Sequence, residues 1–220
     1  MSATVNEGSD TALDPVYRAS EVIFGLLMAM SFIGSISVAT DGREEVRTLL
    51  IAALGCNLAW GLVDAVMHLV ATKTQKRRNH AMLEKLQIGK DPAMGRALLA
   101  DEMSGPLVAS IGEDGLEQLR KRLASQSLPT SRPGLTGRDF GDAIIVFFLV
   151  VLSTFPLVIP FMLTDDTARA LLWSRLAAVA MLFIAGATLA RYSSGNTWLN
   201  GLVMAALGAV LMAAIMALGG

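Results

Sequence analysis

The chain has 220 residues, of which 53% are hydrophobic and 17% are charged, and its mean hydropathy is +0.53. A water-soluble domain carries about a quarter charged residues, so this composition indicates a protein embedded in a lipid bilayer. The net charge of -1 offers no basic surface for nucleic acid. The single cysteine, Cys56, excludes an intramolecular disulfide and any cysteine-rich metal or redox motif.

Five segments are long and apolar enough to cross the hydrocarbon core, which is about 30 Å thick and takes about 20 helical residues. Runs of this length without alternating polarity exclude a transmembrane β-barrel. We therefore expect an all-α integral membrane protein with five transmembrane helices and a small helical cytoplasmic insert between helices 2 and 3. The predicted spans are 22–40, 48–72, 143–163, 170–190 and 197–218.

The segment 73–139 has a different, polar composition and contains twelve of the eighteen Lys and Arg residues. By the positive-inside rule, this insert is expected to be cytoplasmic. Within it, the second helix is expected to continue as far as Gly89. Asp91 and Pro92 then predict a new helix start, and a third helix is expected over 113–124.

These elements predict the order of domains and the orientation of the chain. The first twenty residues lack the basic region and cleavage site of a signal peptide, so the first span is expected to remain in the mature protein. We expect the N-terminus in the cytoplasm and the C-terminus outside, in a bacterial inner membrane. The expected parts are an N-terminal cytoplasmic segment (1–20), helices 1 and 2 (21–72), the cytoplasmic insert with a linker (73–139) and helices 3 to 5 (140–220).

Prolines and small residues mark two of the spans. Pro156 and Pro160 are expected to kink or break the third span, either as a bend that improves packing or as a broken helix that lines a pathway. The last span carries small residues at every fourth position, which allow close helix packing within the subunit or across a dimer. These residues are Gly201, Ala205, Ala209, Ala213 and Ala217.

The second span carries the ionisable residues Asp64 and His68, with Met67 and Asn57 at nearby helical positions. A charged residue at a helix centre costs on the order of 2.5 to 3.5 kcal/mol, so these residues are functional candidates. A face with carboxylate, imidazole and thioether groups suits Fe, Mn or Zn better than Ca or Mg. Alternatively, Asp64 and His68 pair with each other or with Ser and Asn side chains on neighbouring helices.

An antiparallel hairpin of the first two spans that turns near Glu44 would place residue i level with about residue 88 − i. Glu21 would then lie level with Met67 and His68, and Met28 with Trp60. Glu21 is therefore either a further ligand on the cytoplasmic side or a residue that faces lipid headgroups.

Enzyme motifs are absent from the sequence, which contains no H-E-x-x-H, nucleophile elbow, P-loop or dinucleotide fingerprint. We therefore expect no enzyme, no catalytic residue and no resident cofactor.

The chain resembles the vacuolar iron transporter family over nearly its whole length. The resemblance lies in EVIFGLLMAMSFIGSISVA of the first span, FPLVIPFML of the third and WLNGLVMAALGAVLMAAIMALGG at the end. It implies a homodimer that exports Fe(II) or Mn(II) from the cytoplasm in exchange for protons, along a path lined by the first helices. Met28 or a neighbour stands where the family has an aspartate in its first helix. Asp64 or Glu21 would then be a compensating carboxylate, or else the chain no longer moves iron.

Two hypotheses follow for the function. The first is a divalent metal transporter with a metal site formed by Asp64, Met67, His68, Glu21 and Met28. Its expected partners are the divalent metal ion, membrane lipid and a second copy of the chain, without nucleic acid. The second hypothesis is a non-transporting membrane scaffold or sensor whose basic insert docks a protein partner or anionic lipid.

Overall fold

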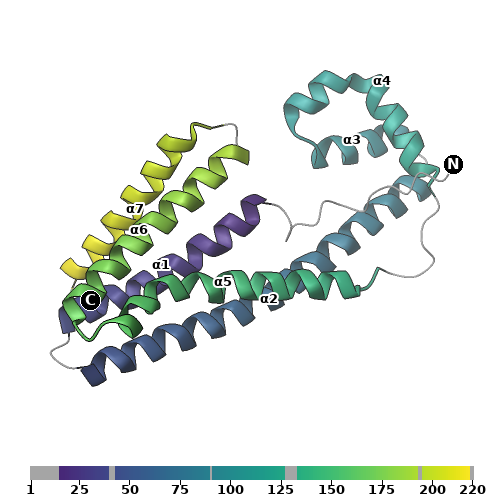
Figure 1. Cartoon of the computed structure of the whole chain (residues 1–220). Helices are drawn as coiled ribbons and strands as arrows, with labels where there is room; N and C mark the ends of the chain where they lie inside the picture. The colour runs from purple at the N-terminus through teal and green to yellow at the C-terminus, as the bar shows by residue number, and fades with distance from the viewer. Residues whose placement is uncertain (1–14, 40–42, 90, 127–132, 193–194, 219–220) are drawn as a thin grey trace. The chain divides into compact units, whose positions relative to one another are not determined.

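The computed structural model describes residues 15–39, 43–89, 91–126, 133–192 and 195–218, which form helices joined by short connections (Figure 1). Five helices are long and apolar enough to cross a membrane, so the protein is an all-α membrane protein, as the sequence predicts. The helices of the described part are α1 (Pro15–Ala39), α2 (Arg43–Ile88), α3 (Pro92–Glu102), α4 (Gly105–Ala124), α5 (Gly137–Leu163), α6 (Thr167–Tyr192) and α7 (Thr197–Ala217).

The chain forms two compact units. The membrane unit comprises Met1–His68 and Gly137–Gly220, and the insert unit comprises Leu69–Thr136. Helix α2, with 46 residues, contributes its first part to the membrane unit and its last part to the insert unit.

The core of the membrane unit lies around α1. Leu26 and Met30 of α1 are fully buried and pack with Leu157 of α5, Leu182 of α6 and Met212 of α7. Helices α6 and α7 lie side by side, and α1 packs against α5, α6 and α7 (Figure 1). The helix at the start of the bundle is therefore also its central packing element.

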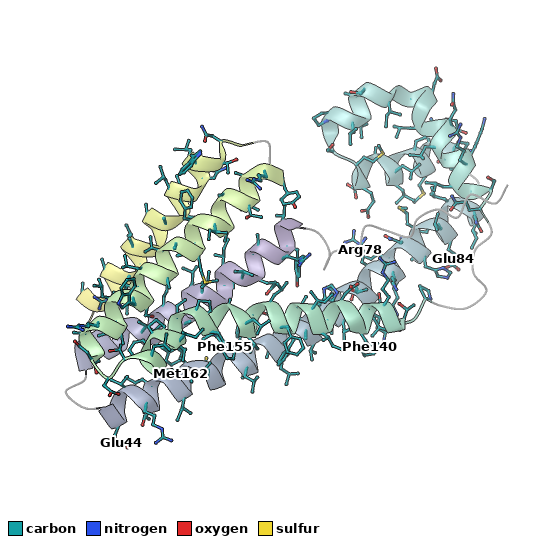
Figure 2. All side chains as sticks on the ribbon, in the orientation of Figure 1. Glu44, Arg78, Glu84, Phe140, Phe155 and Met162 are labelled. Carbon is teal, nitrogen blue, oxygen red and sulfur yellow. The ribbon has the colours of Figure 1, made fainter. Side chains whose placement is uncertain are left out.

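The outer faces of the membrane unit carry large apolar side chains. On α5, Phe140 is 51% exposed, Phe155 44% and Met162 79% (Figure 2). Exposed apolar surface on this scale is unfavourable in water and indicates contact with lipid. The buried and exposed faces of α5 thus fit a helix that packs on one side and meets lipid tails on the other.

Two expectations about the spans are corrected by the structure. Helix α1 begins at Pro15, within the predicted N-terminal segment, because proline suits a first helical position and the next turn buries Ala19 against the bundle. Of the two alternatives for the third span, the broken helix is wrong, because α5 continues through Pro156 and Pro160. Membrane helices tolerate proline where neighbouring helices, Ser or Thr side chains or local adjustments of the helix satisfy the backbone groups that it frees.

The insert unit is held by a small apolar core of Leu86, Leu99 and Leu116, one residue from each of its three helices. As predicted, Asp91 caps α3, because its carboxylate accepts a hydrogen bond from the Ala93 amide at 2.9 Å. Helix α4 begins earlier than the sequence predicts, at Gly105. Gly112 interrupts it with a φ of +66°, which only glycine adopts without strain, so its second part begins where the third helix was expected.

A cluster of ion pairs fastens α3 to α4 in the insert unit. Arg120 donates two hydrogen bonds to the Glu117 carboxylate, at 2.9 and 2.7 Å, and Arg96 of α3 donates a third at 3.4 Å. These hydrogen bonds, those of Arg120 first, lower the pKa of Glu117 to about 2.

Candidate functional site

Polar side chains in the membrane unit gather on α1, α2 and α5. Six of them form two contact clusters, which we call the polar track. It consists of Tyr17, Glu21, Asp64, His68, Asn57 and Thr154.

Helical spacing places these residues on facing sides of α1 and α2. Tyr17, Glu21 and Gly25 follow one another at intervals of four, so they lie on one face of α1. On α2, Asn57, Asp64 and His68 span eleven residue steps, or about 16 Å at the helical rise. The polar track thus covers roughly half of the 30 Å hydrocarbon core.

The first cluster is centred on a pair of carboxyl groups. Glu21 of α1, which is 8% exposed, forms a side-chain hydrogen bond with Asp64 of α2 and another with Tyr17. An ionised carboxylate only accepts hydrogen bonds, so two carboxyl groups bonded to each other must share a proton. Glu21 Oε2 is buried without a hydrogen-bond partner among the described residues. The pair can therefore hold a shared proton, and Glu21 keeps a spare oxygen.

His68 joins this cluster through Tyr17. The two rings are 5.9 Å apart between centroids and are tilted by 50°. His68 is only 5% exposed, whereas most other residues of α2 are exposed. The imidazole thus lies against the phenol that contacts Glu21.

The second cluster lies one helical turn further along α1. The Asn57 amide donates a hydrogen bond to the Gly25 carbonyl at 3.3 Å and another to the Thr154 hydroxyl of α5. Asn57 Oδ1 is buried and has no hydrogen-bond partner among the described residues. This amide ties three helices together and leaves an acceptor free in the interior.

Close packing at two glycines makes this cluster possible. A Cβ atom at Gly25 would lie 2.1 Å from Ser153 Oγ and 2.8 Å from the Val150 carbonyl oxygen. A Cβ atom at Gly61 of α2 would lie 3.1 Å from the Phe147 carbonyl oxygen. A larger residue at Gly25 would force α1 away from α5, and one at Gly61 would require a small shift of α5.

The structure brings Glu21 and Asp64 together but separates the methionines from them. Met67 is 57% exposed, so its side chain lies on the outer surface of α2 although it is only one helical turn from Asp64. Met28 lies two turns beyond Glu21, where its Sδ accepts a weak hydrogen bond from the Cys56 thiol at 3.6 Å. The five predicted ligands therefore do not converge, and the described residues contain no group of three or more His, Cys, Asp or Glu side chains arranged to hold a metal.

The predicted register of the hairpin is wrong by about one helical turn. Glu21 meets Asp64 instead of lying level with Met67, and Met28 meets Cys56 instead of Trp60. The turn comes earlier in the chain than expected. Helix α1 ends at Ala39 and α2 begins at Arg43, whereas the turn was predicted near Glu44.

Sequence reasoning missed several polar residues of this region. Tyr17 was expected outside the membrane, although its spacing from Glu21 and Gly25 is a signal that could have included it. Thr154 has no such signal, because its role depends on which helix packs against Asn57. Asp139 and Asp142 are also buried, near the N-terminus of α5, where the helix dipole favours negative charge.

The fold and the polar track together define a polytopic α-helical membrane protein with ionisable groups inside its helix bundle. Compared with known proteins, the chain matches no family model and no curated protein.

Proposed function

We propose that the protein is a divalent cation transporter that moves Fe(II) or Mn(II) out of the cytoplasm in exchange for protons. The observation that carries this proposal is the hydrogen-bonded pair of Glu21 and Asp64 between two membrane helices. Carboxyl groups within a bilayer are costly, at about 2.5 to 3.5 kcal/mol for an aspartate at a helix centre. Helix packing alone does not require such groups.

The chemistry of the pair supports exchange of a cation for a proton. A divalent cation bound between two carboxylates displaces the proton that they share, because carboxylates bind metal only when deprotonated. The spare Oε2 of Glu21 provides a further oxygen for the ion. Binding and release of the metal would thus be coupled to the opposite movement of protons.

The remaining polar groups support a continuation of the path into the membrane. Beyond the pair lie the free Oδ1 of Asn57 and the Thr154 hydroxyl, followed by the sulfur atoms of Met28 and Cys56. Oxygen ligands suit Mn(II), and sulfur ligands favour softer transition metals over Ca and Mg. The choice of Fe(II) and Mn(II) rests on the resemblance to the vacuolar iron transporter family.

The same proposal includes an orientation and a dimer. The twelve basic residues of segment 73–139 support a cytoplasmic insert, an N-terminus inside and a C-terminus outside, in a bacterial inner membrane. Ala209, Ala213 and Ala217 are exposed on α7, which leaves a small-residue face for a second copy of the chain. An Ala209→Leu variant that remains dimeric would argue against that face.

A second candidate function is a membrane scaffold or sensor without transport. It is favoured by the absence of a three-residue metal group among the described residues. The basic residues Lys73, Arg77 and Arg78 are exposed and would attract a protein partner or anionic lipid.

Metal flux into liposomes separates these two functions. Purified protein is reconstituted with a metal-quenched fluorophore inside the vesicles, and Mn(II) or Fe(II) is added outside with and without a pH gradient. The transporter is expected to quench the dye faster than empty liposomes do, and a gradient that is acidic inside should accelerate quenching. Equal rates in protein-containing and empty liposomes would leave the scaffold function.

A further inference from the structure

A groove of about 340 Å³ lies between α1, α5 and α6 of the membrane unit. Its walls include Val22 of α1, Leu149 of α5 and Met181 of α6, and its other end is lined by Arg18, Thr188 and Tyr192. None of the lining residues belongs to the polar track, so the groove is separate from the proposed metal path. One end of the groove is apolar and the other end carries a cation.

The dimensions of the groove fit a single hydrocarbon chain. From Met181 to Tyr192 it follows eleven residue steps of α6, or about 16 Å, which is close to the depth of one leaflet of a 30 Å hydrocarbon core. Helices α1, α5 and α6 pack directly against one another, so the groove is a seam between packed helices that one flexible hydrocarbon chain can follow.

The end of the groove that contains Arg18 favours a ligand with a negative charge. Arg18 is exposed and Tyr192 is 57% exposed, at the start of α1 and the end of α6. The Thr188 hydroxyl donates to the Ile184 carbonyl at 2.7 Å, so the guanidinium and the phenol are the donors that remain for a ligand. Arginine and tyrosine near the end of a span are placed at headgroup level, where arginine binds a phosphate with paired hydrogen bonds.

We propose that this groove binds an anionic glycerophospholipid, with one acyl chain along Val22 and Met181 and its phosphate on Arg18 and Tyr192. A lipid with a net negative charge is preferred, because a zwitterionic headgroup brings its own cation toward Arg18. The bound lipid fills the space between α1 and α6 and is an integral part of the folded bundle.

The experiment measures binding and melting temperature of the full-length protein in detergent, after removal of lipid. Phosphatidylglycerol is added and compared with phosphatidylcholine of the same chain length. We expect phosphatidylglycerol to raise the melting temperature by several degrees and to remain bound in native mass spectra, with a much smaller effect of phosphatidylcholine. Equal effects of the two lipids would overturn the proposal.

Paired variants test the two ends of the groove. Arg18→Gln should weaken phosphatidylglycerol binding about fivefold, as expected from about 1 kcal/mol per basic residue. Arg191→Gln, on an exposed arginine beside Tyr192 that does not line the groove, should leave binding unchanged. Thr188→Trp should fill the groove and abolish binding, whereas Ala180→Trp, at an exposed position of α6 outside the groove, should not.

The variants also identify other occupants. If Thr188→Trp changes the oligomeric mass and leaves lipid binding intact, a second copy covers the groove and the proposal is wrong. If Thr188→Trp does not fold, the comparison of Arg18→Gln with Arg191→Gln decides alone. Unchanged phosphatidylglycerol binding in Arg18→Gln would overturn the proposal.

Discussion

Two interfaces in the membrane unit contain glycines with equally close neighbours but differ in chemistry. Between α6 and α7, a Cβ atom at Gly201 would lie 2.7 Å from the Phe183 ring, and one at Gly208 would lie 2.2 Å from Leu182 Cδ1. Between α1 and α5, the corresponding distance is 2.1 Å, from Gly25 to Ser153 Oγ. At Gly201 and Gly208, the close neighbours in the α6–α7 interface are apolar side chains. Close packing therefore does not explain why carboxyl and amide groups lie between α1, α2 and α5.

Substituting the glycines should give the largest loss of stability. Gly25→Val places its side chain against the Val150 backbone, which cannot move aside, and Gly208→Val places its side chain against the buried Leu182. Each is expected to lower the free energy of unfolding by about 1 to 3 kcal/mol or more. Thermal unfolding in detergent measures the loss.

Gly55→Val is the matched control, because nothing lies within 4 Å of a Cβ atom at Gly55. Its stability should stay within about 0.5 kcal/mol of the wild type. A Gly25→Val protein as stable as the control would show that α1 and α5 are not packed at this point.

Two substitutions with a similar structural effect separate packing from function. Asn57→Ala removes hydrogen bonds to α1 and α5, and Ser174→Ala removes the bond from α6 to the Leu157 carbonyl of α5, which is 2.7 Å long. Each should cost about 1 kcal/mol, since hydrogen bonds between membrane helices average about 0.6 kcal/mol and reach about 1.7. Only Asn57→Ala should slow metal flux, by severalfold, because only Asn57 belongs to the polar track.

Melting temperature and liposome flux measured on the same two proteins test this difference. The comparison fails if Ser174→Ala slows flux as much as Asn57→Ala, since flux would then follow stability alone.

The sequence predicts the membrane helices well because hydropathy is a property of each segment alone. It predicts Asp64 as a candidate for the same reason, since a charge in an apolar run is visible without a structure. Glu21 lies just outside the predicted first span and is predicted only through the hairpin register. The sequence does not predict that Met67 is exposed or that Met28 contacts Cys56. A shift of one helical turn in the register of α1 against α2 changes which residues of the two helices are in contact. The hairpin register depends on where the turn falls, and Thr154 depends on the packing of α5.

The insert unit provides a third comparison, with partly buried ion pairs. Glu117 has a pKa of about 2 because of its bonds to Arg120 and Arg96, so its ionised form stabilises the contact of α3 with α4. This stabilisation is complete above the unfolded-state pKa of about 4.5 and is lost as the pH falls toward 2. In Glu117→Gln, amide hydrogen exchange in α4 should be a few-fold faster at pH 7.

The difference from the wild type should shrink between pH 4.5 and 2, after correction for intrinsic exchange rates. Glu113→Gln, at an exposed carboxylate of the same helix, is the control and should show no such pH dependence. A constant difference at all pH values would mean that the ion pairs do not stabilise the insert unit.

The most direct test of the central claim is metal flux in Asp64→Asn, measured together with its melting temperature. Asparagine keeps the size of the side chain and can still accept a hydrogen bond from Glu21, but it cannot supply the negative charge that a cation requires. We predict a melting temperature close to that of the wild type and at least tenfold slower flux, which is about 1.4 kcal/mol in barrier height. Met67→Leu, one turn away on the exposed face of α2, should transport normally. Normal flux in Asp64→Asn would contradict the assignment of the Glu21 and Asp64 pair as the cation site.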